Sequence, residues 1–482
     1  MSRSDPHRWE ALAVLCAAFF MTVLDVTIVT VALPSIGEGL AFSRDNLQWV
    51  LTAYAITFGG FLLLGGRTAD LFGRRRVFLA GLGLFTLASL FCGLAWSEGA
   101  LIGSRAAQGL GAAIICPAAL SIIMTTFEEG AERNKALGIW GAIGGGGSAV
   151  GVLAGGLLTK YLGWEWIFFV NLPVGVVALA LTPRFVRASH AGRQGSPDVA
   201  GAVTVTSGLA LLVYAVSNAP AHGWSSGWTF SRLAVAAALL AAFLVIEARS
   251  RNPLMPFRIF RVSTVAGANA ASLLLGAVTF ANFFVLTLYV QQVLGWSVLR
   301  TGVTFIATAG TAILWAGPAQ ALVTKVGPKL VMVAGFVAMG AGMAWYTQIP
   351  VDGSYWSDLL PGYLLIGFAL PFTFIPVSIA ALAGVEAHEA GLASGLFNTA
   401  QQVGGAIGVA VTSSIMLSHF NHLAGAGEPF PRAFTAGAQW AFWVTVGLSI
   451  GGLLVTLALI RSEQLQDDRA EQALAAGPSA AH

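Results

Sequence analysis

Two ionisable residues, Asp25 and Arg105, are the only formal charges that lie well inside the long apolar stretches of this 482-residue sequence. Asp25 stands in the stretch 11–33 and Arg105 in the stretch 100–124. A charged side chain in the middle of a membrane costs about 2.5–3.5 kcal/mol on insertion scales, and such residues generally belong to functional sites. We therefore expect this pair to carry chemistry.

The chemistry that suits the pair is reversible binding of a proton. Counted from the outer ends of their stretches, Asp25 and Arg105 differ in depth by about 6 Å, so both can face one cavity. Burial disfavours an ionised carboxylate and a nearby guanidinium favours it, so a change in their separation would load or release a proton. The pair predicts a proton-coupling site. The structural alternative is a static ion pair that joins two helices.

The composition places these stretches in a membrane. Hydrophobic residues make up 56% of the chain and charged residues 10%, whereas soluble proteins carry about 25% charged residues. Apolar runs of about 20 residues are long enough to cross a bilayer as helices. The net charge of +3 is too small to indicate a nucleic-acid partner. The three cysteines lie in apolar runs, without the spacing of a disulfide framework or a metal site.

Apolar windows predict an all-α fold with fourteen membrane-spanning helices. Most of the 25 Lys and Arg residues fall in the tails and in alternate loops, and this bias places both termini in the cytoplasm. The expected location is the cell membrane, inner or plasma. The windows are 11–33, 47–66, 77–96, 100–124, 136–159, 164–183, 199–217, 232–248, 262–290, 301–323, 329–348, 358–383, 391–417 and 437–460.

Related segments recur in the two halves of the chain. The segment that starts at Ala136 aligns with the segment that starts at Ala393, and the loop that contains Asp70 has a diverged copy in which Thr324 stands at the same place. Parallel repeats with a site at the membrane midplane are a transporter architecture. The predicted units are a six-helix half at 1–185, a linker with inserted spans seven and eight at 186–258, a six-helix half at 259–461 and a cytoplasmic tail at 462–482.

The loop between the second and third spans, GRTADLFGRRR, places an acidic residue among arginines. Gly66 and Gly73 allow close backbone approach and a tight turn. Asp70 lies at a helix end, where it can accept charge-assisted hydrogen bonds from Arg74 and Arg75. We expect this loop to be a cytoplasmic gate that holds in one state and opens in the other. Ordinary positive-inside topology is the alternative, but it explains only the arginines.

The fifth span contains a track of glycines. Small residues at four-residue spacing let two helices pack closely, and most such tracks are only packing surfaces. The alignment of the two halves pairs two of these glycines with Gly404 and Gly408. The track also leaves a seam that can slide or bend. Its candidate functional residues are Gly147, Gly151, Gly155 and Gly156.

These features resemble the fourteen-span drug:proton antiporter family of the major facilitator superfamily, over almost the whole chain. LDVTIVTVALP resembles the family's first-span motif, whose acidic residue falls on Asp25. GSRAAQGLGAA resembles the fourth-span motif, whose arginine, implicated in proton transfer, falls on Arg105. The resemblance implies a major facilitator fold and proton-driven drug efflux. GRTADLFGRRR is similar to the superfamily motif G-x-x-x-D-R-x-G-R-R, and the sixth-span signature is matched at Trp164, Trp166, Phe168, Asn171, Pro173 and Gly175.

Three positions depart from the family pattern. Leu71 replaces the usual basic residue of the loop motif, which weakens the expected cytoplasmic charge network. The antiporter motif G-x-x-x-G-P-x-x-G-G maps onto the glycine track, but Val152 stands in place of its proline, which bears on the direction of transport. Glu165 replaces an arginine at the outer mouth and could attract cations.

The sequence indicates the chemical class of the substrate but not its identity. Family members that favour divalent cations tend to carry an extra acidic residue around the tenth span, and the stretch 301–323 has none. We expect lipophilic monovalent cations, neutral hydrophobic antibiotics or a dye-like metabolite. Aromatic residues on spans more often pack in the core, whereas amides must find a partner in a membrane. Candidate wall residues are Tyr54, Phe58, Asn282, Phe372, Asn398 and Gln401.

Other functions share parts of this pattern. A proton-coupled symporter, or an exporter of one endogenous metabolite, could use the same fold; Val152 slightly favours import, and the Asp25 region favours antiport. An enzyme is disfavoured, because the seven histidines lie in loops or tails and no catalytic motif occurs. We expect a monomeric carrier without a cofactor, driven by the proton gradient. Its partners would be small hydrophobic or cationic substrates, protons and lipid.

Overall fold

The structure of this chain is a computed structural model. It describes residues 6–42, 47, 49–128, 130–188, 198–250, 253, 255, 257, 259, 263–383, 385 and 389–460. Helices dominate these residues, and no strand occurs among them. Thirteen of the described helices are long and apolar enough to cross a membrane, and the 31-residue helix α6 makes a fourteenth span.

Every predicted window coincides with one helix or, at the sixth span, with two. The predicted all-α fold is confirmed, and the predicted number of spans is consistent with these helices. The sixth span consists of two helices, α7 and α8, separated by a turn at Val170. A short π-helix, η2 (Tyr355–Leu359), leads directly into α14. The other bounds are α1 (Arg8–Gly39), α3 (Trp49–Phe72), α4 (Arg74–Gly93), α5 (Glu98–Thr126), α6 (Ala131–Tyr161), α7 (Trp166–Phe169), α8 (Asn171–Phe185), α9 (Val199–His222), α10 (Gly227–Arg249), α11 (Ser263–Gln292), α12 (Val298–Val326), α13 (Pro328–Tyr346), α14 (Leu360–Leu382), α15 (Ala390–Gly425) and α16 (Phe430–Leu459).

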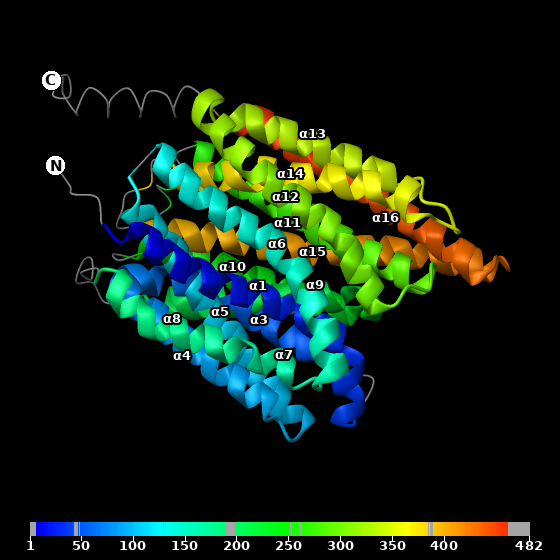
Figure 1. The fold of residues 1–482 in the computed structure, drawn as a ribbon, viewed down its shortest axis with the longest axis horizontal. Helices are drawn as coiled ribbons and strands as arrows, with labels where there is room; N and C mark the ends of the chain where they lie inside the picture. The colour runs from blue at the N-terminus through cyan, green and yellow to red at the C-terminus, as the bar shows by residue number, and fades with distance from the viewer. Residues whose placement is uncertain are drawn as a thin grey trace.

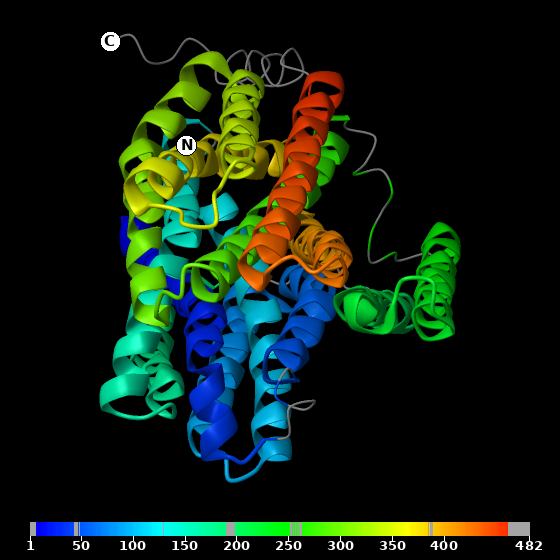
Figure 2. The ribbon, with the colours of Figure 1, turned by 90° about the vertical axis from the view of Figure 1, so that its right-hand side faces the viewer.

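The helices lie side by side along one direction (Figure 1). Helix α1 begins and α16 ends at the same end of the bundle, here named the terminal end; the other end is named the far end. Helix α9 packs against α3 and α15, and α10 packs on α9. In Figure 2 these two inserted helices stand at one side of the bundle, with α10 outermost.

The same helix packing recurs in both halves of the chain. A Cβ added at Gly151 on α6 would meet the carbonyl oxygen of Leu24 on α1, and a Cβ added at Gly408 on α15 would meet that of Ala277 on α11. These are the glycines that the sequence repeat pairs. Helices α1 and α6 therefore pack as α11 and α15 do, with backbones in direct contact that only glycine permits.

The turn after the second helix of each half is also repeated. Gly73, between α3 and α4, has φ of 94°, and Gly327, between α12 and α13, has φ of 84°. This left-handed backbone conformation is costly for residues with a Cβ. The sequence pairs these two glycines as well, so a parallel repeat accounts for both the packing and the turns.

Candidate functional site

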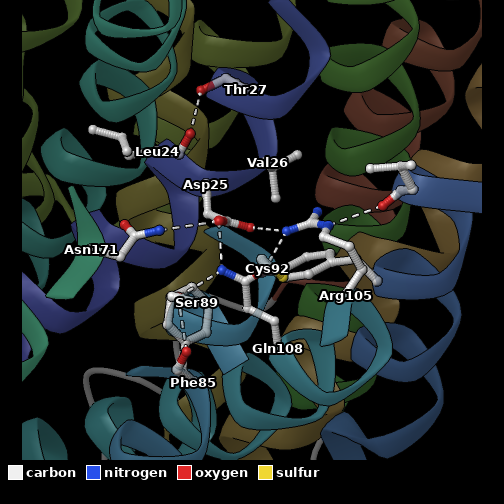
Figure 3. A network of polar contacts seen from close by, with 12 residues as sticks. Leu24, Asp25, Val26, Thr27, Phe85, Ser89, Cys92, Arg105, Gln108 and Asn171 are labelled. Carbon is white, nitrogen blue, oxygen red and sulfur yellow. Dashed lines mark hydrogen bonds and ion pairs between the residues drawn. The ribbon is translucent and has the colours of Figure 1, made fainter. Parts of the chain in front are cut away.

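Asp25 and Arg105 meet inside the first half. Nη1 of Arg105 donates to Oδ2 of Asp25. The relative exposure of Arg105 is 1%, and that of Asp25 is 0%. Figure 3 shows the two side chains pointing toward each other from α5 and α1. The sequence placed them at similar depth and left their contact open; the structure joins them in a fully buried ion pair.

Gln108 connects both charged groups, although it was absent from the predicted site. Its Nε2 donates to Oδ1 of Asp25 at 2.7 Å and to Oγ of Ser89 at 2.8 Å. Its Oε1 accepts a hydrogen bond from Nη1 of Arg105. Because Gln108 follows Arg105 by three residues, both side chains lie on the same face of α5. That spacing is the signal in the sequence from which the contact could have been expected.

Asn171 completes the set of donors around Asp25. Its Nδ2 lies 3.2 Å from Oδ1 of Asp25, and the side chain is buried. Asn171 is the first residue of α8, directly after the turn in the sixth span. Pro173 lacks the N–H that would bind the carbonyl of Phe169, which explains why the helix is interrupted there. The family signature contains Asn171 but does not by itself point to Asp25.

Arg105 has partners on three sides. Its Nε donates to the carbonyl oxygen of Val50 at 2.9 Å, and its guanidinium lies 4.4 Å from the centre of the Tyr54 ring. The Tyr54 hydroxyl is buried and has no hydrogen-bond partner among the described residues. The Tyr54 and Phe58 rings are 5.7 Å apart. Of the predicted wall residues, Tyr54 thus lies directly against the ion pair.

The arrangement can register the arrival of one proton. As a carboxylate, Asp25 accepts hydrogen bonds from Arg105, Gln108 and Asn171. A protonated Asp25 would leave Arg105 buried without its counter-ion, and breaking a buried pair in this way costs about 3–5 kcal/mol. The network must then rearrange, so a single proton can change how α1 and α5 pack.

The loop motif forms a contact between the two halves at the terminal end. Asp70 accepts a hydrogen bond from Arg74 at 3.2 Å and from the backbone N–H groups of Gly391 and Leu392 at 3.1 and 2.9 Å. The first N–H groups of a helix lack partners in their own helix and attract negative charge. These four residues are named the α3–α15 clamp. A Cβ at Gly66 would meet the carbonyl oxygen of Gly391, so the close approach requires glycine.

Two other arginines of the loop motif bind backbone carbonyls of neighbouring segments. Arg75 donates to the carbonyl oxygen of Val186 at 3.2 Å, just after α8. Arg67 donates to that of Pro253 at 3.1 Å. Leu71 contributes no charge at the position where the family has a basic residue.

The second half has a neutral counterpart of the clamp, which the sequence did not reveal in full. Thr324 on α12 stands where Asp70 stands on α3, and its Oγ1 accepts a hydrogen bond from Nδ2 of Asn134 at 3.0 Å. Asn134 lies near the start of α6, at the position that the repeat alignment pairs with Gly391. At the terminal end, a carboxylate of the first half thus accepts hydrogen bonds from the backbone of the second, and the described residues also include a bond between two neutral side chains, Asn134 and Thr324.

Three glycines of the antiporter motif pack on the helix that carries Asp25. Added Cβ atoms at Gly147, Gly151 and Gly155 would each meet atoms of α1, whereas one at Gly156 would meet Leu299 on α12. Glycine here fixes the distance between α6 and α1. The side chain of Val152 lies outside the described part of the structure.

The other predicted residues are spread over several helices. Phe372 on α14 stacks on Phe368 at 4.2 Å, in a cluster with Trp315. Asn282 on α11 is buried, and its Oδ1 has no partner among the described residues. On α15, Asn398 donates to the carbonyl oxygen of Ser394 in its own helix, and Gln401 is half-buried, with its backbone against Gly276 of α11. Glu165 is half-buried directly before α7 at the far end.

Fold and site together define a multi-pass membrane carrier built from two repeated halves. The sequence pattern of the Major Facilitator Superfamily matches residues 15–409. This chain belongs to that superfamily. The human organic anion transporter MFSD10 (TETRAN) has a similar fold, with a TM-score of 0.67 and 18% sequence identity over 94% of this chain and 99% of that protein.

Several relatives are named as antibiotic resistance or export proteins. The puromycin resistance protein pur8 of Streptomyces alboniger is 40% identical over 473 residues, covering 97% of this chain and 93% of that protein. The cephamycin export protein CmcT of Amycolatopsis lactamdurans is 39% identical over 409 residues, 84% of each chain. The lincomycin resistance protein of Streptomyces lincolnensis is 32% identical over 469 residues, 96% of this chain and 94% of that protein.

Proposed function

We propose that this protein is a proton-coupled antiporter that exports hydrophobic drugs, antibiotics or lipophilic monovalent cations from the cytoplasm. Export of such compounds is supported by relatives named for resistance to, or export of, puromycin, cephamycin and lincomycin. Coupling to protons is supported by one observation above all, the buried ion pair between Asp25 and Arg105. The protein works as a monomer and without a cofactor.

The terminal end of the bundle faces the cytoplasm. Arg67 lies near the end of α3, and Arg74 and Arg75 begin α4; the turn between these two helices is at the terminal end. Lys and Arg are enriched in cytoplasmic loops, which supports this orientation in the cell membrane. The far end, with Glu165, then faces outward.

Alternating access links the ion pair to the clamp. With the α3–α15 clamp closed, the cytoplasmic ends of the halves are in contact. A proton that reaches Asp25 from outside releases Arg105, changes the packing of α1 and favours the state in which the clamp opens. Drug enters from the cytoplasm as the proton leaves Asp25, and the restored ion pair favours closure. Each proton driven inward by 100 mV supplies about 2.3 kcal/mol.

Replacing Asp25 tests the proposal directly. In everted vesicles, wild type should dissipate an imposed pH gradient when drug is added, and Asp25→Asn should not. The amide keeps the size and some hydrogen bonds of the carboxylate but cannot carry a proton at this position. Asp25→Asn should still exchange drug for drug across the membrane, which shows that it folds and binds. Proton-driven export by Asp25→Asn at the wild-type rate would contradict the assignment.

Import by symport is the second candidate for the same fold. The two directions differ in the sign of one measurement: an imported substrate moves with the proton, and an exported one moves against it. In everted vesicles acidified inside, drug should accumulate in the lumen of the vesicles. Loss of preloaded drug down the proton gradient would indicate a symporter.

A further inference from the structure

Four aromatic rings meet where the two halves of the bundle join. Phe19 on α1 stacks on Trp140 on α6, with ring centres 3.9 Å apart and planes 8° from parallel. Phe374 on α14 meets Phe397 on α15 edge to face at 5.7 Å. Trp140 and Phe397 are buried, with relative exposures of 1% and 0%. These residues are named the aromatic cluster.

Glycines on α6 bring the two ring pairs together. A Cβ added at Gly141 would lie 3.0 Å from Phe374. One added at Gly144 would lie 3.4 Å from Phe19 and 4.0 Å from Phe374. Rings from both halves therefore rest on the same bare stretch of α6, with no side chain of these glycines between them.

The aromatic cluster lies between the clamp and the ion pair. Phe19 precedes Asp25 by six residues on α1, which is about 9 Å toward the terminal end. Phe397 follows Gly391 by six residues on α15, which is about 9 Å toward the far end. A solute that moved along the junction of the halves, from the clamp to the level of Asp25, would pass these rings.

We propose that Trp140 is a specificity-determining residue that stacks on planar aromatic substrates when the halves separate. The inference rests on the proposed export function and adds to it the residue that distinguishes planar from non-planar substrates. Phe19 already covers the indole face in parallel contact, which is the position that a flat ring of a substrate takes. Displacement of Phe19 by the substrate exchanges one stacked ring for another, so the face is never left exposed.

Removing the two rings has opposite consequences. Stacking on an aromatic side chain changes affinity by about tenfold or more. Trp140→Leu should weaken binding of ethidium, a planar cation, by about tenfold. Trp140→Phe keeps a ring and should lose about threefold or less. Phe19→Ala removes the ring that competes for the indole face, so it should tighten ethidium binding.

Binding to the purified protein measures these effects without reference to transport. The probes are ethidium and tetraphenylphosphonium, two lipophilic monovalent cations of which only ethidium presents an extended flat ring system. Tetraphenylphosphonium should change by less than about twofold in each variant. The matched control is Trp228→Leu, which removes an indole from another parallel stacked pair, His222 and Trp228 at 3.9 Å on the inserted helices, and should leave both affinities unchanged.

Equal losses for the two probes in Trp140→Leu would overturn the inference, because they would indicate that the indole only fills space. Weaker ethidium binding in Phe19→Ala would overturn it too, and so would a wild type that binds neither probe. The proposed function fails by a different result: ethidium binds selectively through Trp140, but its export does not consume the proton gradient. Thermal unfolding of each variant confirms that it is folded.

Discussion

The buried position that holds the ion pair in the first half holds neutral side chains in the second half. The contact of Gly151 with Leu24 and that of Gly408 with Ala277 occupy the same position in the two halves. The next residues on α1 and α11 are Asp25 and Val278. Val278 is fully buried, as Asp25 is. A carboxylate in the first half therefore corresponds to an apolar side chain in the second.

The same comparison gives the counterpart of the arginine. A Cβ at Gly109 would meet the carbonyl oxygen of Tyr54, and one at Gly367 would meet that of Thr308. Four residues before these glycines stand Arg105 and Tyr363. Tyr363 is fully buried.

The tyrosine is satisfied by a neutral contact. The hydroxyl of Tyr363 lies 3.0 Å from Oγ1 of Thr304. The fold thus packs this position with valine and tyrosine in one half, and with aspartate and arginine in the other. Replacing a buried ion pair by well-packed neutral residues is often neutral or stabilising. The first half therefore keeps its charges for a reason other than packing, which supports a role in transport.

The largest effect is expected when only one partner of the pair is removed. Arg105→Ala leaves the Asp25 carboxylate buried without its cation, which should cost about 3–5 kcal/mol of stability and abolish export. Arg105→Lys should also impair export, because an ammonium lacks the rigid fork of donors. The measurements are thermal unfolding in detergent and drug efflux from cells.

The second half supplies the control for this loss. Tyr363→Phe removes one neutral hydrogen bond, which is worth about 1 kcal/mol, and should leave export near the wild-type rate. Full turnover by Arg105→Ala would leave the pair with a packing role only.

Copying the second half into the first separates stability from transport. The double variant Asp25→Val/Arg105→Tyr puts valine and tyrosine, the residue types of Val278 and Tyr363, in place of the ion pair. Its stability should return to within about 1–2 kcal/mol of wild type, since no charge remains buried, and proton-driven export should be lost. A double variant as unstable as Arg105→Ala would show that the charges are needed for folding.

The spans were predictable because a bilayer imposes a length and composition on each helix that a sequence displays directly. The shared depth of Asp25 and Arg105 followed from counting residues along the helices. Their contact did not follow, because it depends on the rotation of each helix about its axis, which is set by tertiary packing. The sequence signature included Asn171, but its hydrogen bond to Asp25 was not predicted for the same reason: the bond depends on how α8 packs against α1.

The predicted wall residues show the same limit of prediction from sequence: a residue's place on a span can be predicted, but its contacts cannot. Tyr54 lies on the guanidinium of Arg105, whereas Phe372 packs with Phe368 and Trp315. Residue type and position on a span do not distinguish these two aromatic residues, since each is buried on a membrane helix. Their roles in binding stay predictions, as do the roles of the amides on α11 and α15.

The two contacts at the terminal end extend the comparison to a smaller effect. Asp70→Ala removes the acceptor of three hydrogen bonds, and charge-assisted bonds of this kind are worth about 1.5–3 kcal/mol. The open state should become about tenfold more populated. Thr324→Ala removes the neutral bond to Asn134 and should shift the same equilibrium by about twofold to fivefold.

A buried reporter measures this opening. Ser394 is fully buried on α15, one turn beyond Gly391, so maleimide labelling of a Ser394→Cys reporter reports separation of the halves at the terminal end. The matched control is Asp358→Ala, since Asp358 accepts a backbone hydrogen bond from Ser354 at the far end. Equal labelling rates in Asp70→Ala and Thr324→Ala would show that the charge of the clamp is irrelevant to closure.

The smallest effect concerns Asn171, the more distant of the two neutral amide donors to Asp25. Asn171→Ala removes one of three donors to the Asp25 carboxylate, while Arg105 and Gln108 remain. This bond to a carboxylate is long at 3.2 Å and two donors remain, so its loss should cost about 1 kcal/mol, below the usual range of about 1.5–3 kcal/mol for a bond to a charged group. That corresponds to about 0.7 pH units. Because the lost donor favoured the ionised form, protonation should compete with drug at higher pH than in wild type. The pH below which bound drug is displaced should therefore rise by about 0.5–1 unit, measured by drug binding to the purified protein. Asn269→Ala is the control, since among the described residues Asn269 donates to the carbonyl oxygen of Val265 in its own helix, and this variant should leave the midpoint unchanged. An unchanged midpoint in Asn171→Ala, with the same fold and drug affinity as wild type at high pH, would remove Asn171 from the coupling network and leave Arg105 and Gln108 as its working donors.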